Sequence, residues 1–192
     1  MKCRACKKRL SIKFIDLVSS PPSNSYLTIK DLDKPEIYFP LKLYLCNSCF
    51  LIQIKEYKKS IEIFSDDYAY FSSVSSSWLK HCENYVQIIT RKLNLSKQSL
   101  VLEIASNDGY LLQYFKEKEI PVLGVEPSKS VADFANSIGI KTHNEFFNHD
   151  YALKLAKNSK PDLIICNNVL AHVPNLNNFI SGLKLVLKKD GV

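Results

Sequence analysis

Residues 100–115, LVLEIASNDGYLLQYF, combine a strand, a turn and the start of a helix, and this stretch decides the fold. The apolar run ends at Glu103, a short polar loop follows, and apolar residues then recur at helical spacing. A dinucleotide-binding turn would carry glycines where Ala105, Asn107 and Gly109 stand. Asn and Asp adopt left-handed backbone more readily than most residues, so the loop can still turn sharply. The stretch therefore predicts a Rossmann-like binding turn that keeps one of its three glycines.

The flanking segments continue the alternation of strands and helices. Strand composition recurs at 121–127, within 140–147 and at 162–170, and the last of these is apolar on both faces, as central parallel strands are. Helical spacing is found at 75–93, 110–119, 128–139 and 176–189. Such alternation predicts an α/β fold with right-handed crossovers. Ser128 is a plausible cap at the start of one helix, and Gly139 a stop at its end.

The residues of the turn favour S-adenosylmethionine over a dinucleotide. The Asn107 side chain would obstruct the approach of a pyrophosphate to the backbone, which disfavours NAD and FAD. S-adenosylmethionine carries no phosphate, and its methionine end brings one ammonium and one carboxylate. Such a ligand needs an acid, carbonyls and helix N–H groups.

Further signals lie at the ends of the later strands. Glu126 ends the second strand 17 residues after Gly109, where a carboxylate can accept both ribose hydroxyls. NEFF at 144–147 would cover the adenine, and Asn167 would lie beside the methionine. The predicted cofactor-binding residues are Glu103, Ala105, Asn107, Gly109, Glu126 and Asn167.

Four of the six cysteines form two CxxC pairs, with 39 residues between the pairs. Two such knuckles supply the four thiolates of a tetrahedral zinc site. A redox CxxC is usually single and starts a helix, which neither pair does. The predicted metal ligands are Cys3, Cys6, Cys46 and Cys49. Cys82 and Cys166 lie within apolar patterns and are predicted to be core thiols.

The charge of the chain is unevenly distributed. Residues 1–60 hold twelve Lys or Arg against five Asp or Glu, whereas residues 61–192 hold fourteen of each. The excess could mark a surface for nucleic acid or a phosphorylated substrate, or serve only solubility. The sequence contains no run of 18 apolar residues that would predict a membrane span. Its first residues also lack the apolar segment of a secretory signal. We therefore expect a cytoplasmic protein with reduced cysteines.

Composition divides the chain into three predicted parts. Residues 1–60 form an irregular zinc-binding domain, with a strand at 37–46 that Pro40 interrupts, and SSPPSN at 19–24 excludes helix and central strand. Residues 61–95 form a Ser- and aromatic-rich connector and a helix, and residues 96–192 form the Rossmann-like domain.

The whole chain resembles the S-adenosylmethionine-dependent sugar C-methyltransferases, which methylate a ring carbon of a nucleotide-linked keto-deoxysugar. The resemblance lies in the two CxxC knuckles and in FIDLVSSPPSNSYL (14–27), YFPLKLYLCNSCFLIQI (38–54), YFSSVSSSWLKH (70–81), VLEIASNDGYLLQYF (101–115) and VLGVEPS (122–128). It implies a structural zinc, a connector that lines the sugar-nucleotide site, and a base that forms an enolate to accept the methyl group. Tyr70 is then the candidate for contacting the sugar.

The resemblance also implies a longer protein. Family members carry a Tyr-His-Glu-His-like segment that supplies the base, and nothing in this chain matches it. The base role is therefore not carried onto His172, which we expect to be a loop residue near the cofactor, although His172 and His81 would be the first residues to test if the chain alone were active. We expect an N-terminal fragment with an incomplete class I methyltransferase domain that a C-terminal half would complement. Its strands would be ordered three, two, one, four, with strand four as an exposed apolar edge. The alternatives are a zinc-ribbon RNA methyltransferase and a non-catalytic zinc-binding remnant. The aromatic residues of the connector argue against RNA binding, because they lie among serines and not among lysines and arginines.

Overall fold

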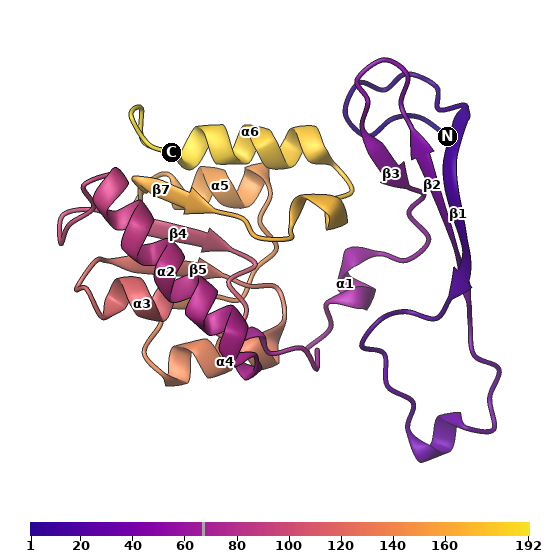
Figure 1. Cartoon of the computed structure of the whole chain (residues 1–192), viewed down its shortest axis with the longest axis horizontal. Coiled ribbons are helices and arrows are strands. Elements are labelled where there is room, and N and C mark those ends of the chain that lie inside the picture. Colours follow the sequence, from indigo (N-terminus) through magenta and orange to yellow (C-terminus); the bar gives the residue numbers. More distant parts are fainter. Residues whose placement is uncertain (67) are drawn as a thin grey trace. The chain divides into compact units, whose positions relative to one another are not determined.

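The computed structural model describes residues 1–66 and 68–192, which form two compact units. Unit 1 comprises residues 1–63 and 171–177, and unit 2 comprises residues 64–170 and 178–192 (Figure 1). Among the described residues, no helix is long and apolar enough to cross a membrane.

Unit 1 contains a three-stranded antiparallel sheet in the order β1-β2-β3, formed by β1 (Ile12–Ser20), β2 (Phe39–Leu45) and β3 (Ile52–Ile54). The unit also holds η1 (Ile29–Asp31) and α1 (Ser60–Ile63). The predicted break at Pro40 is wrong, because this proline lies inside β2 opposite Ser19. The ladder has a register shift between Asp16 and Ser19, and Val18 has a left-handed backbone. A bulge of this kind lets a strand accommodate a residue that has no N–H.

Unit 2 contains a four-stranded parallel sheet formed by β4 (Val101–Ile104), β5 (Val122–Val125), β6 (Thr142–His143) and β7 (Leu163–Ile165). The strands are ordered β6-β5-β4-β7, which confirms the predicted order three, two, one, four. The α/β prediction is therefore correct. The carboxyl ends of β4, β5 and β6 meet at one edge, the place where ligands bind in open parallel sheets.

The helices of unit 2 are η2 (Ser72–Val74), α2 (Ser76–Lys92), α3 (Leu112–Lys116), α4 (Lys129–Ser137) and α5 (His149–Leu155); η3 (Leu170–His172) and α6 (Leu176–Val186) extend across the division between the units. Figure 1 shows α2 crossing in front of the strands, and α5 and α6 beyond β7. Helix α5 was not predicted from the sequence. Its N-cap is Asn148, whose side chain accepts the Tyr151 N–H at 2.8 Å.

One buried cluster joins α2, α3 and α4 to the sheet. Its members are Cys82, Val86, Val101, Tyr110, Leu111, Leu112, Phe115, Ile120, Ala135, Ile140, Leu163 and Ile165. Cys82 is thus a core thiol, as predicted, whereas Cys166 is only half-buried. The turn between β4 and α3 joins two elements of this cluster, so the cluster fixes its position.

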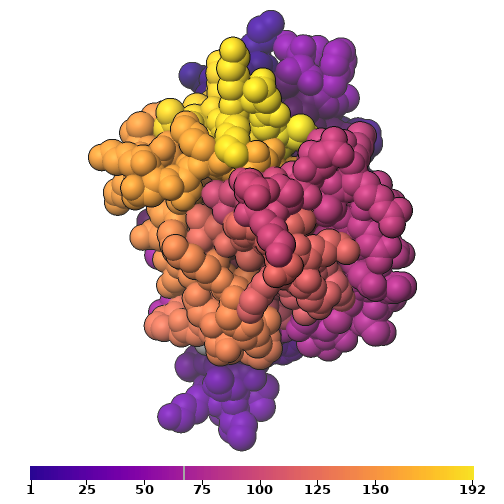
Figure 2. All heavy atoms as spheres, turned by 90° about the vertical axis from the view of Figure 1, so that its left-hand side faces the viewer, coloured from indigo at the N-terminus to yellow at the C-terminus, as the bar shows by residue number. Residues whose placement is uncertain are grey.

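The edge of β7 is partly paired, which corrects the expectation of an exposed apolar edge. The Ile164 N–H donates to the Val192 carbonyl at 2.8 Å, and the Val192 N–H donates to the Asp162 carbonyl at 2.9 Å. The side chains of Leu163 and Ile165 are buried. In the surface view of Figure 2 the last residues, in yellow, adjoin the orange segment that contains β7.

Candidate cofactor site and zinc site

The four predicted metal ligands converge in unit 1. Their sulfur atoms all lie within 4.8 Å of one another. Cys3 Sγ is 3.6 Å from Cys49 Sγ, and Cys6 Sγ is 3.5 Å from Cys46 Sγ. A zinc ion with four thiolates at about 2.3 Å would hold its sulfurs about 3.8 Å apart. The four side chains therefore fit a tetrahedral zinc site made of two interleaved knuckles.

The two knuckles are built by the same local hydrogen bonds. Lys7 N–H donates to the Cys3 carbonyl at 3.1 Å, and Phe50 N–H donates to the Cys46 carbonyl at 2.8 Å. Lys7 and Phe50 both have left-handed backbones, with φ of 63° and 59°. Each knuckle closes on itself, because Cys3 N–H donates to Lys8 and Cys46 N–H donates to Leu51. The ligand geometry is thus set within each knuckle and repeated.

Gln53 supports the zinc site and was missed in the sequence. Its Nε2 donates to Cys3 Sγ at 3.3 Å, and its Oε1 accepts the Arg4 N–H at 2.9 Å. Burial would raise the pKa of the Cys3 thiol, but the Gln53 amide and nearby backbone N–H groups lower this pKa to about 6. The amide ties β3 to the first knuckle and favours the thiolate that zinc requires. The only sequence signal was a polar residue between two apolar ones in β3.

The turn after β4 adopts the backbone that glycines would normally provide. Ala105, Asn107 and Gly109 have φ values of 54°, 48° and 82°, so the left-handed conformation occurs at all three glycine positions. The predicted sharp turn of this loop is therefore present. A Cβ at Gly109 would also lie 3.1 Å from Ile140 Cγ1, so the Ile140 side chain would have to shift slightly.

Gly124 brings the loop close to β5, and it was not singled out in the sequence. A Cβ at this position would lie 2.4 Å from Ser106 Oγ and 2.6 Å from Thr142 Oγ1. A glycine inside a strand often marks such a close approach, so the signal was available. Any side chain at this position would force the side chains of Ser106 and Thr142 to move.

Glu126 closes the loop from the end of β5. Its Oε2 accepts the Asn107 N–H and its Oε1 accepts the Ser128 N–H, both at 2.9 Å. The side chain is 3% exposed, and burial raises the pKa of its carboxyl above the usual value. Each oxygen keeps a further lone pair, so the carboxylate could still accept ribose hydroxyls.

Glu103 is fully buried at the end of β4. Neither carboxylate oxygen makes a well-formed hydrogen bond with the described residues, although the Tyr110 hydroxyl is close enough to lower the carboxyl pKa somewhat. Burial outweighs this effect and holds the pKa of Glu103 well above its usual range. A buried acid without partners is destabilising unless a ligand pairs with it. The residue therefore fits a cationic group such as the ammonium of S-adenosylmethionine.

Asn167 and Cys166 lie near this buried acid, whereas the Asn107 side chain is engaged elsewhere. Asn167 Nδ2 donates to the Tyr110 hydroxyl at 3.4 Å. Burial, together with Glu103, raises the pKa of Cys166 to about 12. The Asn107 amide binds the backbone of the connector, as described below.

The remaining candidates are dispersed. Tyr70 is 50% exposed, and its ring lies 6.5 Å from that of Tyr68. His81 stacks on Trp78 with ring centroids 5.1 Å apart. His172 ends η3 in the segment grouped with unit 1. The structure therefore brings the predicted residues of β4, its turn and β5 together with Asn167, which follows β7.

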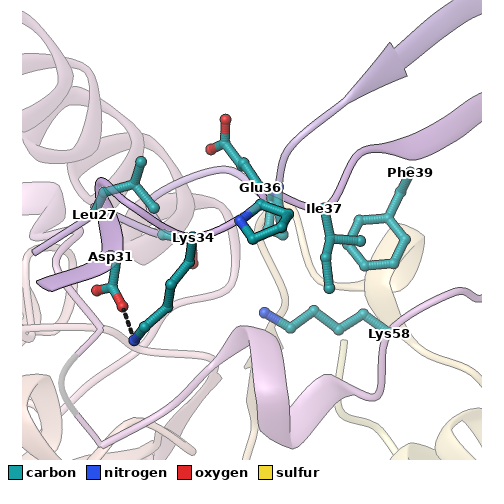
Figure 3. Close-up of a pocket in the computed structure, with 10 residues that line it drawn as sticks. Leu27, Asp31, Lys34, Glu36, Ile37, Phe39 and Lys58 are labelled. Carbon is teal, nitrogen blue, oxygen red and sulfur yellow. Dashed lines mark hydrogen bonds and ion pairs between the residues drawn. The ribbon is translucent and has the colours of Figure 1, made fainter.

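Unit 1 also contains a pocket of about 260 Å³ between the segment 22–39 and Lys58 (Figure 3). Its lining includes two acids and two lysines, and Asp31 Oδ1 pairs with Lys34 Nζ at 2.9 Å. The charges balance, so the pocket offers no net attraction for a diphosphate. We assign no cofactor to it.

Two family models match the chain. One, described as a putative zinc binding domain, matches residues 3–64, and the other, a methyltransferase domain, matches residues 102–192. The chain is also 26% identical over its full 192 residues to the C-methyltransferase NovU from Streptomyces niveus. It spans 46% of that relative, or about half its length.

Similar solved structures include two methyltransferases and the protein DesVI. The magnesium protoporphyrin IX methyltransferase ChlM of Synechocystis PCC 6803, solved with bound SAM, is 19% identical with a TM-score of 0.47, over 67% of this chain and 64% of that one. DesVI of Streptomyces venezuelae is 13% identical with a TM-score of 0.48, over 62% and 50%. An S-adenosylmethionine-dependent methyltransferase of Clostridium acetobutylicum is 20% identical with a TM-score of 0.48, over 59% and 48%.

The order of the two matched domains agrees with the order of the two sites along the chain. The four clustered cysteines fall within the first match, and the left-handed turn and Glu126 fall within the second. The chain therefore combines a putative zinc binding domain with a methyltransferase domain, each matched by its own family model.

Proposed function

We propose that the chain provides the zinc-binding and cofactor-binding parts of an enzyme that methylates a ring carbon of a nucleotide-linked keto-deoxysugar. One observation carries the cofactor assignment: the backbone is left-handed at all three glycine positions of a turn whose N–H group at Asn107 binds Glu126. The carbon specificity is supported by the likeness to a C-methyltransferase. The sugar class is supported by the sequence resemblance across both domains.

The roles of the cofactor-binding residues follow from their charge and burial. Glu103, buried and lacking well-formed hydrogen bonds, would pair with the ammonium of the methionine end. The left-handed turn from Ala105 to Gly109 would present backbone groups to the carboxylate. Glu126 would accept the ribose hydroxyls with its remaining lone pairs, and Asn167 would lie beside the methionine. The bound cofactor supplies an electrophilic methyl group.

We further propose that residues 61–95 contribute to the substrate site and that Tyr70 contacts the sugar. Tyr70 is 50% exposed, so part of the residue is accessible to a ligand. The zinc site would be structural, because four thiolates leave no open coordination position for chemistry. Thiolate ligands of this kind agree with a cytosolic location, where cysteines stay reduced.

A second candidate is an RNA methyltransferase, which the positive charge of residues 1–60 favours. Exposed aromatic side chains in unit 1, such as Phe50 beside the second knuckle, could stack on bases. Binding of single-stranded RNA that weakens steeply with salt would support this candidate. Binding of a nucleotide-linked sugar with little dependence on salt would support the first.

The cofactor assignment is tested by calorimetry with S-adenosylhomocysteine. Glu126→Ala should weaken binding by about 1–3 kcal/mol, because the ribose hydroxyls lose their acceptor. Glu117→Ala, at the end of α3, removes an exposed acid and serves as the matched control with unchanged affinity. Equal affinity of the Glu126 variant and the wild type would refute the assignment.

A further inference from the structure

The side chain of Asn107 holds one part of the connector, namely residues 66 and 68–74. Its Oδ1 accepts the Ser72 N–H at 2.8 Å, and its Nδ2 donates to the Tyr70 carbonyl at 3.0 Å. One amide thus binds both a donor and an acceptor of the connector backbone, as a neighbouring strand would. These groups are 35 and 37 residues away in the sequence, so the contact is tertiary.

Asp108 extends this contact by one residue. Its Oδ2 accepts the Ser73 N–H at 3.0 Å, and the side chain is 1% exposed. Two consecutive side chains of the cofactor loop therefore cap two consecutive N–H groups of the connector at η2. Hydrogen bonds to a carboxylate are stronger than those between neutral groups, which favours Asp at this position.

The connector is fixed a second time at the start of α4. Ser130 N–H donates to the Asp66 carbonyl at 3.0 Å, and Ser130 Oγ donates to the Tyr68 carbonyl at 3.4 Å. Glu126 completes the circuit, because its carboxylate binds the N–H groups of both Asn107 and Ser128. Connector, cofactor loop and α4 are therefore joined in a closed ring of hydrogen bonds around Glu126.

We propose that Asn107 and Asp108 are positioning residues that couple cofactor binding to the order of the connector. The inference rests on the proposed function, because it takes the loop and Glu126 as the cofactor site. The backbone of Asn107 is bound to Glu126 while its side chain is bound to the connector. The loop cannot leave its left-handed conformation without releasing Tyr70 and its neighbours.

This coupling explains why the central glycine position holds Asn. With φ of 48°, glycine would fit the backbone with less strain, but it would leave the connector unheld. Because coupling between sites is reciprocal, a cofactor that stabilises the loop should order the connector, and a released connector should weaken the cofactor. Asn107 and Asp108 would thereby hold Tyr70 in place for the substrate.

The experiment compares amide hydrogen exchange at Ser72 and Ser73 with and without S-adenosylhomocysteine. In the wild type, the ligand should slow exchange of both amides further. Asn107→Gly keeps a residue suited to the left-handed backbone, so the fold should persist while both amides exchange faster and the affinity falls about tenfold. Asp108→Ala should affect Ser73 most, and Asp108→Asn should restore part of its protection. Asn148→Ala removes a side-chain cap at α5 and is the matched control that should leave both amides unchanged.

The outcomes separate this proposal from the proposed function. If the wild type binds the ligand but Asn107→Gly keeps wild-type exchange at Ser72 and Ser73, the clamp is refuted and the cofactor site stands. If the clamp is seen without ligand but the ligand changes neither amide, the coupling is refuted. If the wild type shows no binding, the proposed function fails together with the coupling.

Discussion

Unit 1 and unit 2 place their sites on left-handed backbone by different means. Among the described residues of unit 1, the buried apolar ones are Cys3, Leu10, Cys46 and Leu176, and two of these four are predicted metal ligands. Eight of the nine residues of β1 are exposed. In unit 2 the turn lies between a buried parallel sheet and helices that share one large cluster. A small core in which half of the buried apolar residues are metal ligands depends on the metal, whereas a site on a large packed core does not.

The largest expected effect is therefore the loss of unit 1 when zinc is removed. Structural zinc contributes roughly 10 kcal/mol or more in small domains, so chelation or Cys46→Ser should unfold unit 1 and leave unit 2 folded. Hydrogen exchange of β2 and of β4, together with elemental analysis that gives one zinc per chain, measures both parts. Cys166→Ser is the control and should keep the zinc. Protected β2 amides in metal-free protein would show that the two units do not differ in this way.

A smaller effect should follow from the buried acid of unit 2. Since burial raises the Glu103 pKa, the free energy of unfolding should fall as the pH rises from about 4.5 through the raised pKa. Glu103→Gln should stabilise unit 2 by about 1–3 kcal/mol at neutral pH and reduce this slope to the part due to Glu126. The variant should bind S-adenosylhomocysteine less tightly. Urea titrations at several pH values make the measurement, and an unchanged slope would count against a buried, ionisable Glu103.

The smallest effect concerns the backbone of the turn. Ala105 has φ of 54°, so Ala105→Gly should raise the stability of unit 2 by about 1 kcal/mol. Ala135→Gly, in the buried interior of α4, is the opposite control and should lose about 1 kcal/mol. The thermal unfolding midpoints of the two variants should shift in opposite directions from the midpoint of the wild type. A loss of stability in both would mean that the turn is not strained at Ala105.

Repeated or periodic features were predictable from the sequence. The two CxxC pairs gave the metal ligands, and the alternation of strands and helices, with the family resemblance, gave the sheet order. Asn107 was correctly expected to accept a left-handed backbone, whereas Asp108 does not adopt one and Ala105 does. These features depend on neighbouring residues or on regular spacing, which a single sequence displays directly.

Features that depend on distant partners were missed. Gln53 binds a sulfur 50 residues away, and the Asn107 amide binds a connector 35 residues away. Strand β1 was missed because its side chains are exposed on both faces and show no alternation, and α5 because it is only seven residues long. In each case the feature depends on the tertiary fold and not on the local sequence pattern.

The self-contained knuckles also define where the molecule can be altered. Each knuckle fixes its own pair of sulfurs, and the segment 21–38 between β1 and β2 supplies neither ligands nor strand pairing. The entropy of closing a loop grows only slowly with its length, so insertions there should be tolerated. This segment is thus a position at which new recognition elements can be inserted while the metal centre keeps its geometry.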